Sequence, residues 1–175
     1  MIQNLARLAF SLLCHQDPAR SWAPAGVPAA LCQRCAGVYM GAFFALFLFP
    51  LARFKPGTKI LCLHGAFLLQ GAVLALAPLA QPGWIRTLSG QIFAQGALYF
   101  LWLHILFQRR LLKEGAAPFH YFAGLLFSLF FVQIIVHYPI AVGVTLIHLF
   151  SLMGLLALMT LVVISIFFLI RRPEC

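Results

Sequence analysis

The chain has 175 residues, of which 63% are hydrophobic and only 9% are charged. An ordinary soluble domain carries about a quarter charged residues, so this composition excludes that class and indicates a membrane protein. The formal net charge is +9, but the basic residues lie between apolar segments, which argues against a nucleic-acid partner. We interpret them as topology signals and lipid-headgroup contacts, so the predicted partner is the lipid bilayer.

The first segment predicts a short amphipathic helix that lies at the membrane interface. Four leucines recur at helical spacing, with Arg7 on another face: Leu5, Leu8, Leu12 and Leu13. The apolar stretch is too short and too interrupted for a secretory signal peptide.

Five apolar segments follow, each near the roughly 20 residues that a helix needs to cross a bilayer core of about 30 Å. The predicted crossings are residues 36–54, 60–80, 88–107 and 118–138, and a last helix that ends at 170. Pro118 suits a first helical position, and Pro139 with Gly143 allows a tight reversal. Gly37 and Gly41 belong to a small-residue ridge suited to close helix packing.

The predicted fold class is therefore an all-α, polytopic membrane bundle of about five transmembrane helices. We expect one membrane domain over residues 1–175. It divides into an interfacial helix and Cys/His loop (1–35), a three-helix core (36–107) and a two-helix extension (118–170).

The Lys and Arg residues predict which end of the bundle faces the cytoplasm. Five crossings put four of them on one side: Arg7, Arg20, Arg34 and Arg86. The other side receives eight: Arg53, Lys55, Lys59, Arg109, Arg110, Lys113, Arg171 and Arg172. Because cytoplasmic loops carry the excess, we expect a cytoplasmic C-terminus and an outward-facing N-terminal loop.

That N-terminal loop holds the chemistry-bearing residues, Cys14-His15 and Cys32-Gln33-Arg34-Cys35. A Cys-x-x-Cys pair lets two thiolates reach one tetrahedral ion, and Cys14 and His15 would supply the remaining ligands. Adjacent residues can share an ion only where the helix has ended, which the Asp17-Pro18 step favours. Zinc fits this ligand set best, because iron–sulfur clusters normally need four cysteines.

Two other interpretations use the same residues. Cys32 and Cys35 at a helix N-terminus would have lowered thiol pKa values and could act as a redox pair, with a quinone or haem accepting electrons. A structural bridge from Cys14 to one of the pair is the third interpretation. The sequence does not match the attachment motif of a c-type haem, because Ala36 stands where that motif needs histidine.

Five histidines lie in or at the ends of predicted helices. Four of them are candidates, His64, His104, His137 and His148, and His120 lies near the inner end with His64 and His104. Ionisable groups in a membrane are candidate functional residues. The outer pair, His137 and His148, could complete a metal site or accept protons. The inner pair, His64 and His104, could ligate haem b. Neutral histidines hydrogen-bonded between helices are the structural alternative.

The N-terminal motif resembles the signature of a prokaryotic membrane-protein family, domain of unknown function 2085. The similarity consists of Cys14-His15-Gln16, Arg20-Ser21, and Cys32-x-Arg34-Cys35-x-Gly37-x-Tyr39. A weaker match runs from Arg86 to Gly90, with Ser89 where the family usually has threonine. Gln70-Gly71 stands where the family often has Asp-Gly, so a carboxylate is replaced here. The resemblance covers about residues 14–96.

The resemblance implies a prokaryotic inner-membrane location, and it implies one constellation of residues rather than a reaction. These residues are Cys14, His15, Arg20, Ser21, Cys32, Arg34, Cys35 and Arg86. The three arginines would bind an anion or lipid headgroup, or contact headgroups nonspecifically. The predicted function is zinc or other thiophilic-metal binding. The alternatives are a membrane thiol-disulfide oxidoreductase and a non-enzymatic module that binds lipid or stabilises a partner.

Overall fold

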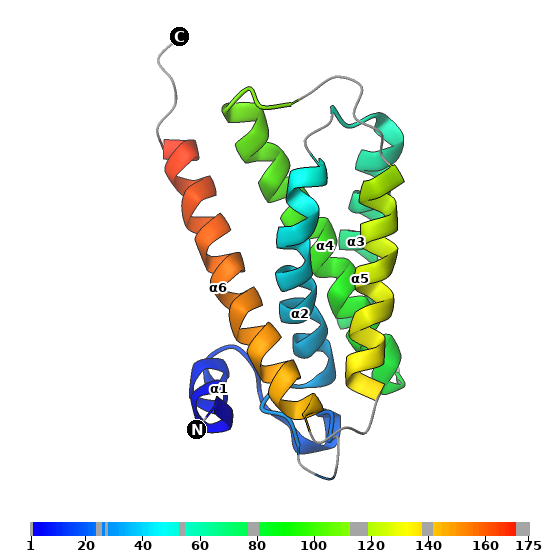
Figure 1. The fold of residues 1–175 in the computed structure, drawn as a ribbon, viewed down its shortest axis with the longest axis vertical. Helices are drawn as coiled ribbons and strands as arrows, with labels where there is room; N and C mark the ends of the chain where they lie inside the picture. Colours follow the sequence, from blue (N-terminus) through cyan, green and yellow to red (C-terminus); the bar gives the residue numbers. More distant parts are fainter. Residues whose placement is uncertain are drawn as a thin grey trace.

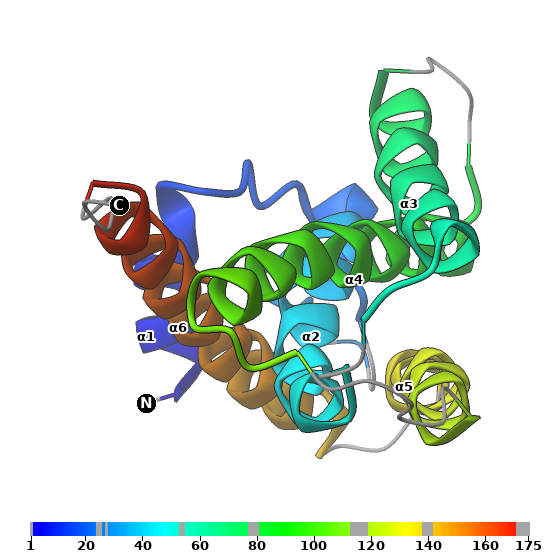
Figure 2. The same ribbon diagram turned by 90° about the horizontal axis from the view of Figure 1, so that it is seen from above.

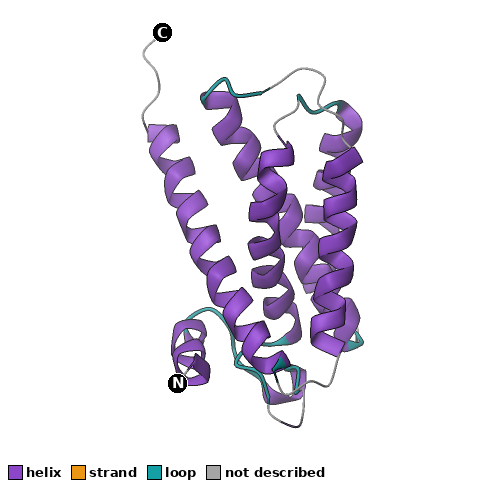
Figure 3. Cartoon of the chain, in the orientation of Figure 1, coloured by secondary structure: helices purple, strands orange, loops and turns teal. Residues whose placement is uncertain are grey.

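The computed structural model describes residues 2–23, 26, 28–52, 55–76, 81–112, 119–137 and 142–170. Within these ranges the regular elements are helices (Figure 3). The one strand-like feature of the described residues is an isolated antiparallel bridge between Ser21 and Cys32. The predicted all-α membrane bundle is confirmed.

The helices are, in chain order, α1 (Ile2–Ser11), the short 3-10 turn η1 (Pro18–Arg20), α2 (Gln33–Leu48), the 3-10 turn η3 (Phe49–Ala52), α3 (Thr58–Leu76), α4 (Gly83–Gln108), α5 (Phe119–His137) and α6 (Gly143–Ile170). Three of them, α4, α5 and α6, are long and apolar enough to cross a membrane. The shorter apolar helices α2 and α3 lie beside them in the same bundle (Figure 1).

Seen from above, α2 and α4 lie in the middle of the bundle, with α6 on one side and α3 and α5 on the other (Figure 2). The helix directions place the starts of α2, α4 and α6 at one end and the start of α5 at the other (Figure 1). The helix α1 packs beside the start of α6, at the end where α2 also begins. We call this end the cysteine end, because Cys14, Cys32 and Cys35 lie there.

Two helix boundaries differ from the sequence prediction for local chemical reasons. The first crossing was expected to reach residue 54, but α2 ends at Leu48 and passes into η3, where Pro50 lacks the N–H that an α-helix needs. The helix α4 begins at Gly83 rather than at 88, directly after Pro82, whose ring fixes φ near the helical value (−59°) at the N-cap. Pro118 and Pro139 lie outside the described residues.

Glycine allows the central helices to touch through their backbones. A Cβ at Gly37 of α2 would lie 2.0 Å from the Thr87 carbonyl oxygen of α4. A Cβ at Gly154 of α6 would lie 1.7 Å from the Tyr39 carbonyl oxygen of α2. Association of helices in lipid depends on such close packing, because the surrounding tails are as apolar as the side chains.

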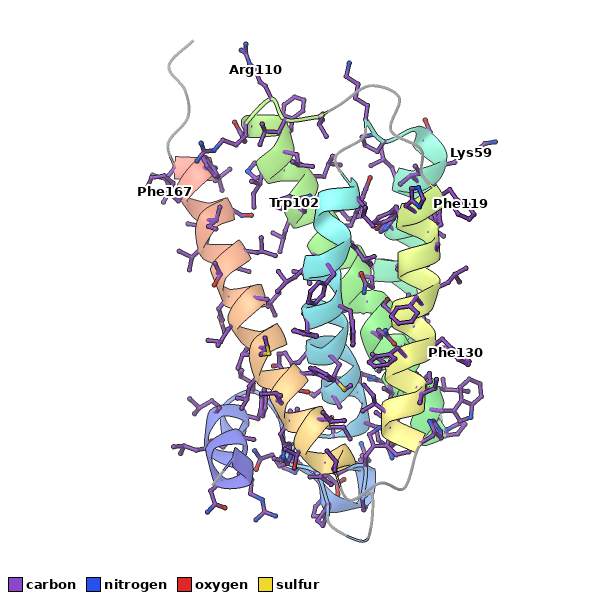
Figure 4. The ribbon with its side chains drawn as sticks, viewed as in Figure 1. Lys59, Trp102, Arg110, Phe119, Phe130 and Phe167 are labelled. Atoms are coloured by element: carbon purple, nitrogen blue, oxygen red, sulfur yellow. The ribbon has the colours of Figure 1, made fainter. Side chains whose placement is uncertain are left out.

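Large apolar side chains cover the outside of the bundle, as expected for a protein whose solvent is lipid. Phe119, Phe130 and Phe167 point away from the helices (Figure 4) and are 72%, 69% and 48% exposed. Polar groups are instead buried: Gln91 of α4 donates to the Ser128 carbonyl of α5 at 2.7 Å. This distribution is the reverse of that in a soluble domain.

Candidate metal centre

The cysteine cluster is built on the turn that ends α1. The Cys14 N–H donates to the Phe10 carbonyl at 2.8 Å, and Phe10 is fully buried with its ring 5.2 Å from that of Tyr39 in α2. Gln16 takes a left-handed backbone conformation with φ of 53°, and its side chain donates to the Arg7 carbonyl at 2.7 Å. The chain therefore reverses directly after Cys14, which keeps this thiol against the bundle.

A capped turn then brings the chain back toward α2. Asp17 accepts the Ala19 N–H at 2.9 Å and so caps η1, as a carboxylate at such a position does. The buried Ser21 donates from its hydroxyl to the Asp17 carbonyl at 2.9 Å and pairs through its backbone with Cys32. The role of Ser21 here is to join the Cys14 turn to the Cys32 segment.

The result is a group of three thiols whose sulfur atoms all lie within 4.8 Å of one another: Cys14, Cys32 and Cys35. The Cys32 N–H points at Cys14 Sγ at 3.4 Å, and the Cys35 N–H points at Cys32 Sγ at 3.5 Å. Cys14 is buried, and the other two are half-buried. Two of the sulfurs thus sit at the N-terminus of α2, where backbone N–H groups favour negative charge.

Hydrogen bonds within the group control its protonation. Bonds from the Cys32 and Cys35 thiols lower the pKa of the Cys14 thiol well below its ordinary value. Donation to Cys14 raises the pKa of the Cys32 thiol, because deprotonation would remove that bond. Deprotonation of the group is therefore favoured first at Cys14, and a bound dication would promote loss of the other thiol protons.

Two long-range contacts hold the loop onto the bundle, and neither was predicted from the sequence. The Trp22 indole donates to the Thr87 hydroxyl at 2.8 Å, and that hydroxyl also lies 3.1 Å from the Gln33 carbonyl. The Ala30 N–H donates to Nε2 of His148 at 2.8 Å, in a buried position. These contacts fix the segment just before Cys32 against α4 and α6.

The structure does not bring the candidate histidine ligands into the sulfur group. His15 is exposed although its neighbour Cys14 is buried. His137 is exposed with its ring 4.9 Å from that of Trp22. Nε2 of His148 already accepts the hydrogen bond from the Ala30 N–H. Among the described residues, the group of potential ligands consists of the three cysteines.

The two histidines at the other end do not form a pair of free ligands. His64 is fully buried, and its two ring nitrogens lie 2.9 Å from the Ile60 carbonyl and 2.7 Å from the Tyr121 hydroxyl. Its ring stacks on Tyr99 at 3.8 Å. His104 is half-buried near the end of α4. His64 therefore has the geometry of a histidine hydrogen-bonded between helices, with no nitrogen left for an axial haem bond.

The three arginines predicted to act together have different surroundings. Arg20 is exposed and pairs with Asp17 at 3.3 Å. Arg34 reaches across to α3 and donates to the Leu74 carbonyl at 2.7 Å and to the Gln81 side-chain oxygen at 3.1 Å. Arg86 is half-buried on the first turn of α4. Arg34 also lines a pocket, which is described below.

The fold and the site together define a helical membrane protein with a three-cysteine cluster at one end of its bundle. The sequence model of one family, domain of unknown function 2085, matches residues 14–100. Its description is "predicted membrane protein". This match confirms the resemblance over the region that contains the cluster, helices α2 and α3 and the first part of α4.

A curated relative matches a short part of the chain. An uncharacterised protein of the archaeon Methanocaldococcus jannaschii is 37% identical over 51 residues, which is 29% of this chain and 33% of the relative. The aligned part thus spans about a third of that protein. No solved structure matches the chain.

Proposed function

We propose that this membrane protein binds zinc or another thiophilic ion through Cys14, Cys32 and Cys35. The observation that carries the proposal is the mutual approach of the three sulfurs within 4.8 Å. Thiolates about 2.3 Å from a tetrahedral zinc lie roughly 3.8 Å from one another, so small side-chain rotations would close the site.

Three protein ligands leave one tetrahedral position for water or another small ligand, which is the arrangement of reactive rather than purely structural zinc sites. His15 is exposed and outside the group, so we do not include it among the ligands. The bound ion would tie the loop to the start of α2, and thereby to the end of the bundle where α6 also begins.

Metal analysis of purified protein tests this proposal. We expect about one zinc per chain in the wild type and in His15→Ala, and loss of the metal in Cys14→Ser because one of three thiolates is removed. Cys62→Ser is the matched control, since Cys62 is an exposed thiol of α3 outside the cluster. A metal-free wild type with intact thiols, or equal metal in the Cys14 and Cys62 variants, would contradict the proposal.

A second candidate function is thiol-disulfide exchange. It is favoured by Cys32 and Cys35 standing one turn apart at the start of α2, with the Cys35 N–H directed at Cys32 Sγ at 3.5 Å. Oxidation of this dithiol would release two protons and two electrons to an acceptor such as a quinone in the bilayer.

Thiol trapping of the same preparation separates the two functions. A redox pair would change from two free thiols to one disulfide between reducing and oxidising conditions, with Cys62 reacting with the trapping reagent in both. Cys32 and Cys35 that stay unreactive until a chelator is added would instead support the metal site.

A further inference from the structure

A pocket of about 330 Å³ lies between α2, α3 and α4, separate from the cysteine cluster. Its lining residues are Arg34, Val38, Gly71, Ala72, Ser89, Gly90 and Phe93. Ala72 is exposed and Phe93 is 36% exposed, so the pocket opens on the outer surface of the bundle, which faces lipid. This volume is within the range of about 300–1,000 Å³ that is usual for small-ligand sites.

Glycines keep the helices close around this pocket. A Cβ at Gly90 of α4 would lie 2.2 Å from the Arg34 carbonyl oxygen, and a Cβ at Gly71 of α3 would lie 2.5 Å from the Phe93 Cβ. The two contacts fix α4 against α2 and α3 on either side of the opening. The pocket is therefore a feature of the helix packing rather than of a loop.

Arg34 brings a positive charge to this apolar pocket, and no carboxylate among the described residues neutralises it. The chain has three acidic residues, and Asp17, the one among the described residues, pairs with Arg20. The groups that hold Arg34 are neutral oxygens of Leu74 and Gln81, and its Nε is buried with no hydrogen-bond partner in the described part of the chain. A half-buried guanidinium with spare donors favours an anion, because charge-assisted bonds to phosphate are its strongest available contacts.

The pocket lies near the depth of lipid headgroups. Arg34 is in the first turn of α2, and the exposed Trp84 is in the first turn of α4, which begins at the same end of the bundle. Tryptophan and arginine near helix ends are typical of the membrane–water interface. From that level, the apolar lining of Val38, Ala72 and Phe93 offers a surface for an acyl chain.

From these observations we propose that the pocket binds one anionic phospholipid of the surrounding bilayer. Its phosphate meets the Arg34 guanidinium, and the first part of an acyl chain lies against α3 and α4. This site is independent of metal binding, because Arg34 and Cys35 leave α2 toward different neighbours.

Native mass spectrometry of delipidated protein titrated with phosphatidylglycerol or phosphatidylcholine tests the proposal. We expect one phosphatidylglycerol to bind about tenfold or more tightly than phosphatidylcholine, as a charge-assisted bond provides. Arg34→Gln should lose this preference. Because Arg34 also holds α3, Ala72→Phe is the second variant: it fills the pocket from its exposed rim and should abolish the tight adduct.

Val73→Phe is the matched control, since Val73 is the next residue, is 54% exposed and does not line the pocket. It should bind lipid as the wild type does. Equal binding of the two lipids, or an unchanged adduct in Ala72→Phe, would overturn the proposal. Displacement of phosphatidylglycerol by millimolar inorganic phosphate would also overturn it, because the site would then recognise a free anion and not a lipid.

Discussion

His148 shows how a single side chain fixes the loop that carries Cys32. Its Nε2 accepts the Ala30 N–H at 2.8 Å, so the ring is neutral with its proton on Nδ1. His148 is 1% exposed and Ala30 is 3% exposed, so water cannot replace this bond. The N–H of Ala30 would remain unpaired if the imidazole were absent, and a buried unpaired donor is costly.

We therefore expect His148→Leu, which keeps the side-chain volume, to lower the free energy of unfolding by about 1–3 kcal/mol. The measurement is unfolding in mixed micelles titrated with sodium dodecyl sulfate, followed by tryptophan fluorescence. His120→Leu at an exposed position of α5 is the control and should stay within about 0.5 kcal/mol of wild type. Equal stability of the two variants would show that the Ala30 bond contributes nothing.

Among the helices, α2 packs directly against three others, α4, α5 and α6. It touches α4 through Gly37 and α6 at Tyr39, and Cys35 lies in its first turn, with Cys32 directly before the helix. Because backbone meets backbone at these crossings, a methyl group cannot be accommodated by rotating a side chain. The position of the cluster thus depends on the small residues of its neighbours as well as on the loop.

Gly154→Ala tests this dependence, since the new Cβ would lie 1.7 Å from the Tyr39 carbonyl oxygen. We expect the separation of α2 and α6 to cost about 1–3 kcal/mol or more in the same unfolding measurement. Gly65→Ala of α3 is the matched control, because its Cβ would meet nothing within 4 Å. It should be neutral or more stable by up to about 1 kcal/mol, from helix propensity. Similar losses in both variants would contradict close packing as the cause.

Across the whole molecule, the sequence predicted what depends on local spacing and composition. Hydropathy predicted the all-α bundle, and the thiol spacing predicted that Cys32 and Cys35 would share a site with Cys14. The contacts that hold the loop were not predictable, because Trp22–Thr87 and Ala30–His148 join residues 65 and 118 positions apart. The exposure of the His15 side chain was not predictable either, since the direction of a side chain in a turn depends on backbone angles that residue spacing does not encode.

The orientation of the bundle in the membrane is a prediction at this same scale. The described residues put Lys59 and Arg110 at the end opposite the cysteine cluster (Figure 4), and most basic residues were assigned to that side from the sequence. Since cytoplasmic loops carry the excess of Lys and Arg, we expect the end of α6 at Ile170 to be cytoplasmic and the cluster to face outward.

Reporter fusions in a bacterial host test this orientation. Green fluorescent protein fused to the C-terminus should fluoresce, and alkaline phosphatase fused there should be inactive, because each reporter matures on only one side of the membrane. Fusions made after Val142, which directly precedes α6, are the matched control and should give the opposite pair of signals. An active phosphatase at the C-terminus together with a fluorescent fusion at Val142 would reverse the orientation. The cysteine cluster would then face the reducing cytoplasm, where thiolates remain available for metal and a stable disulfide is disfavoured.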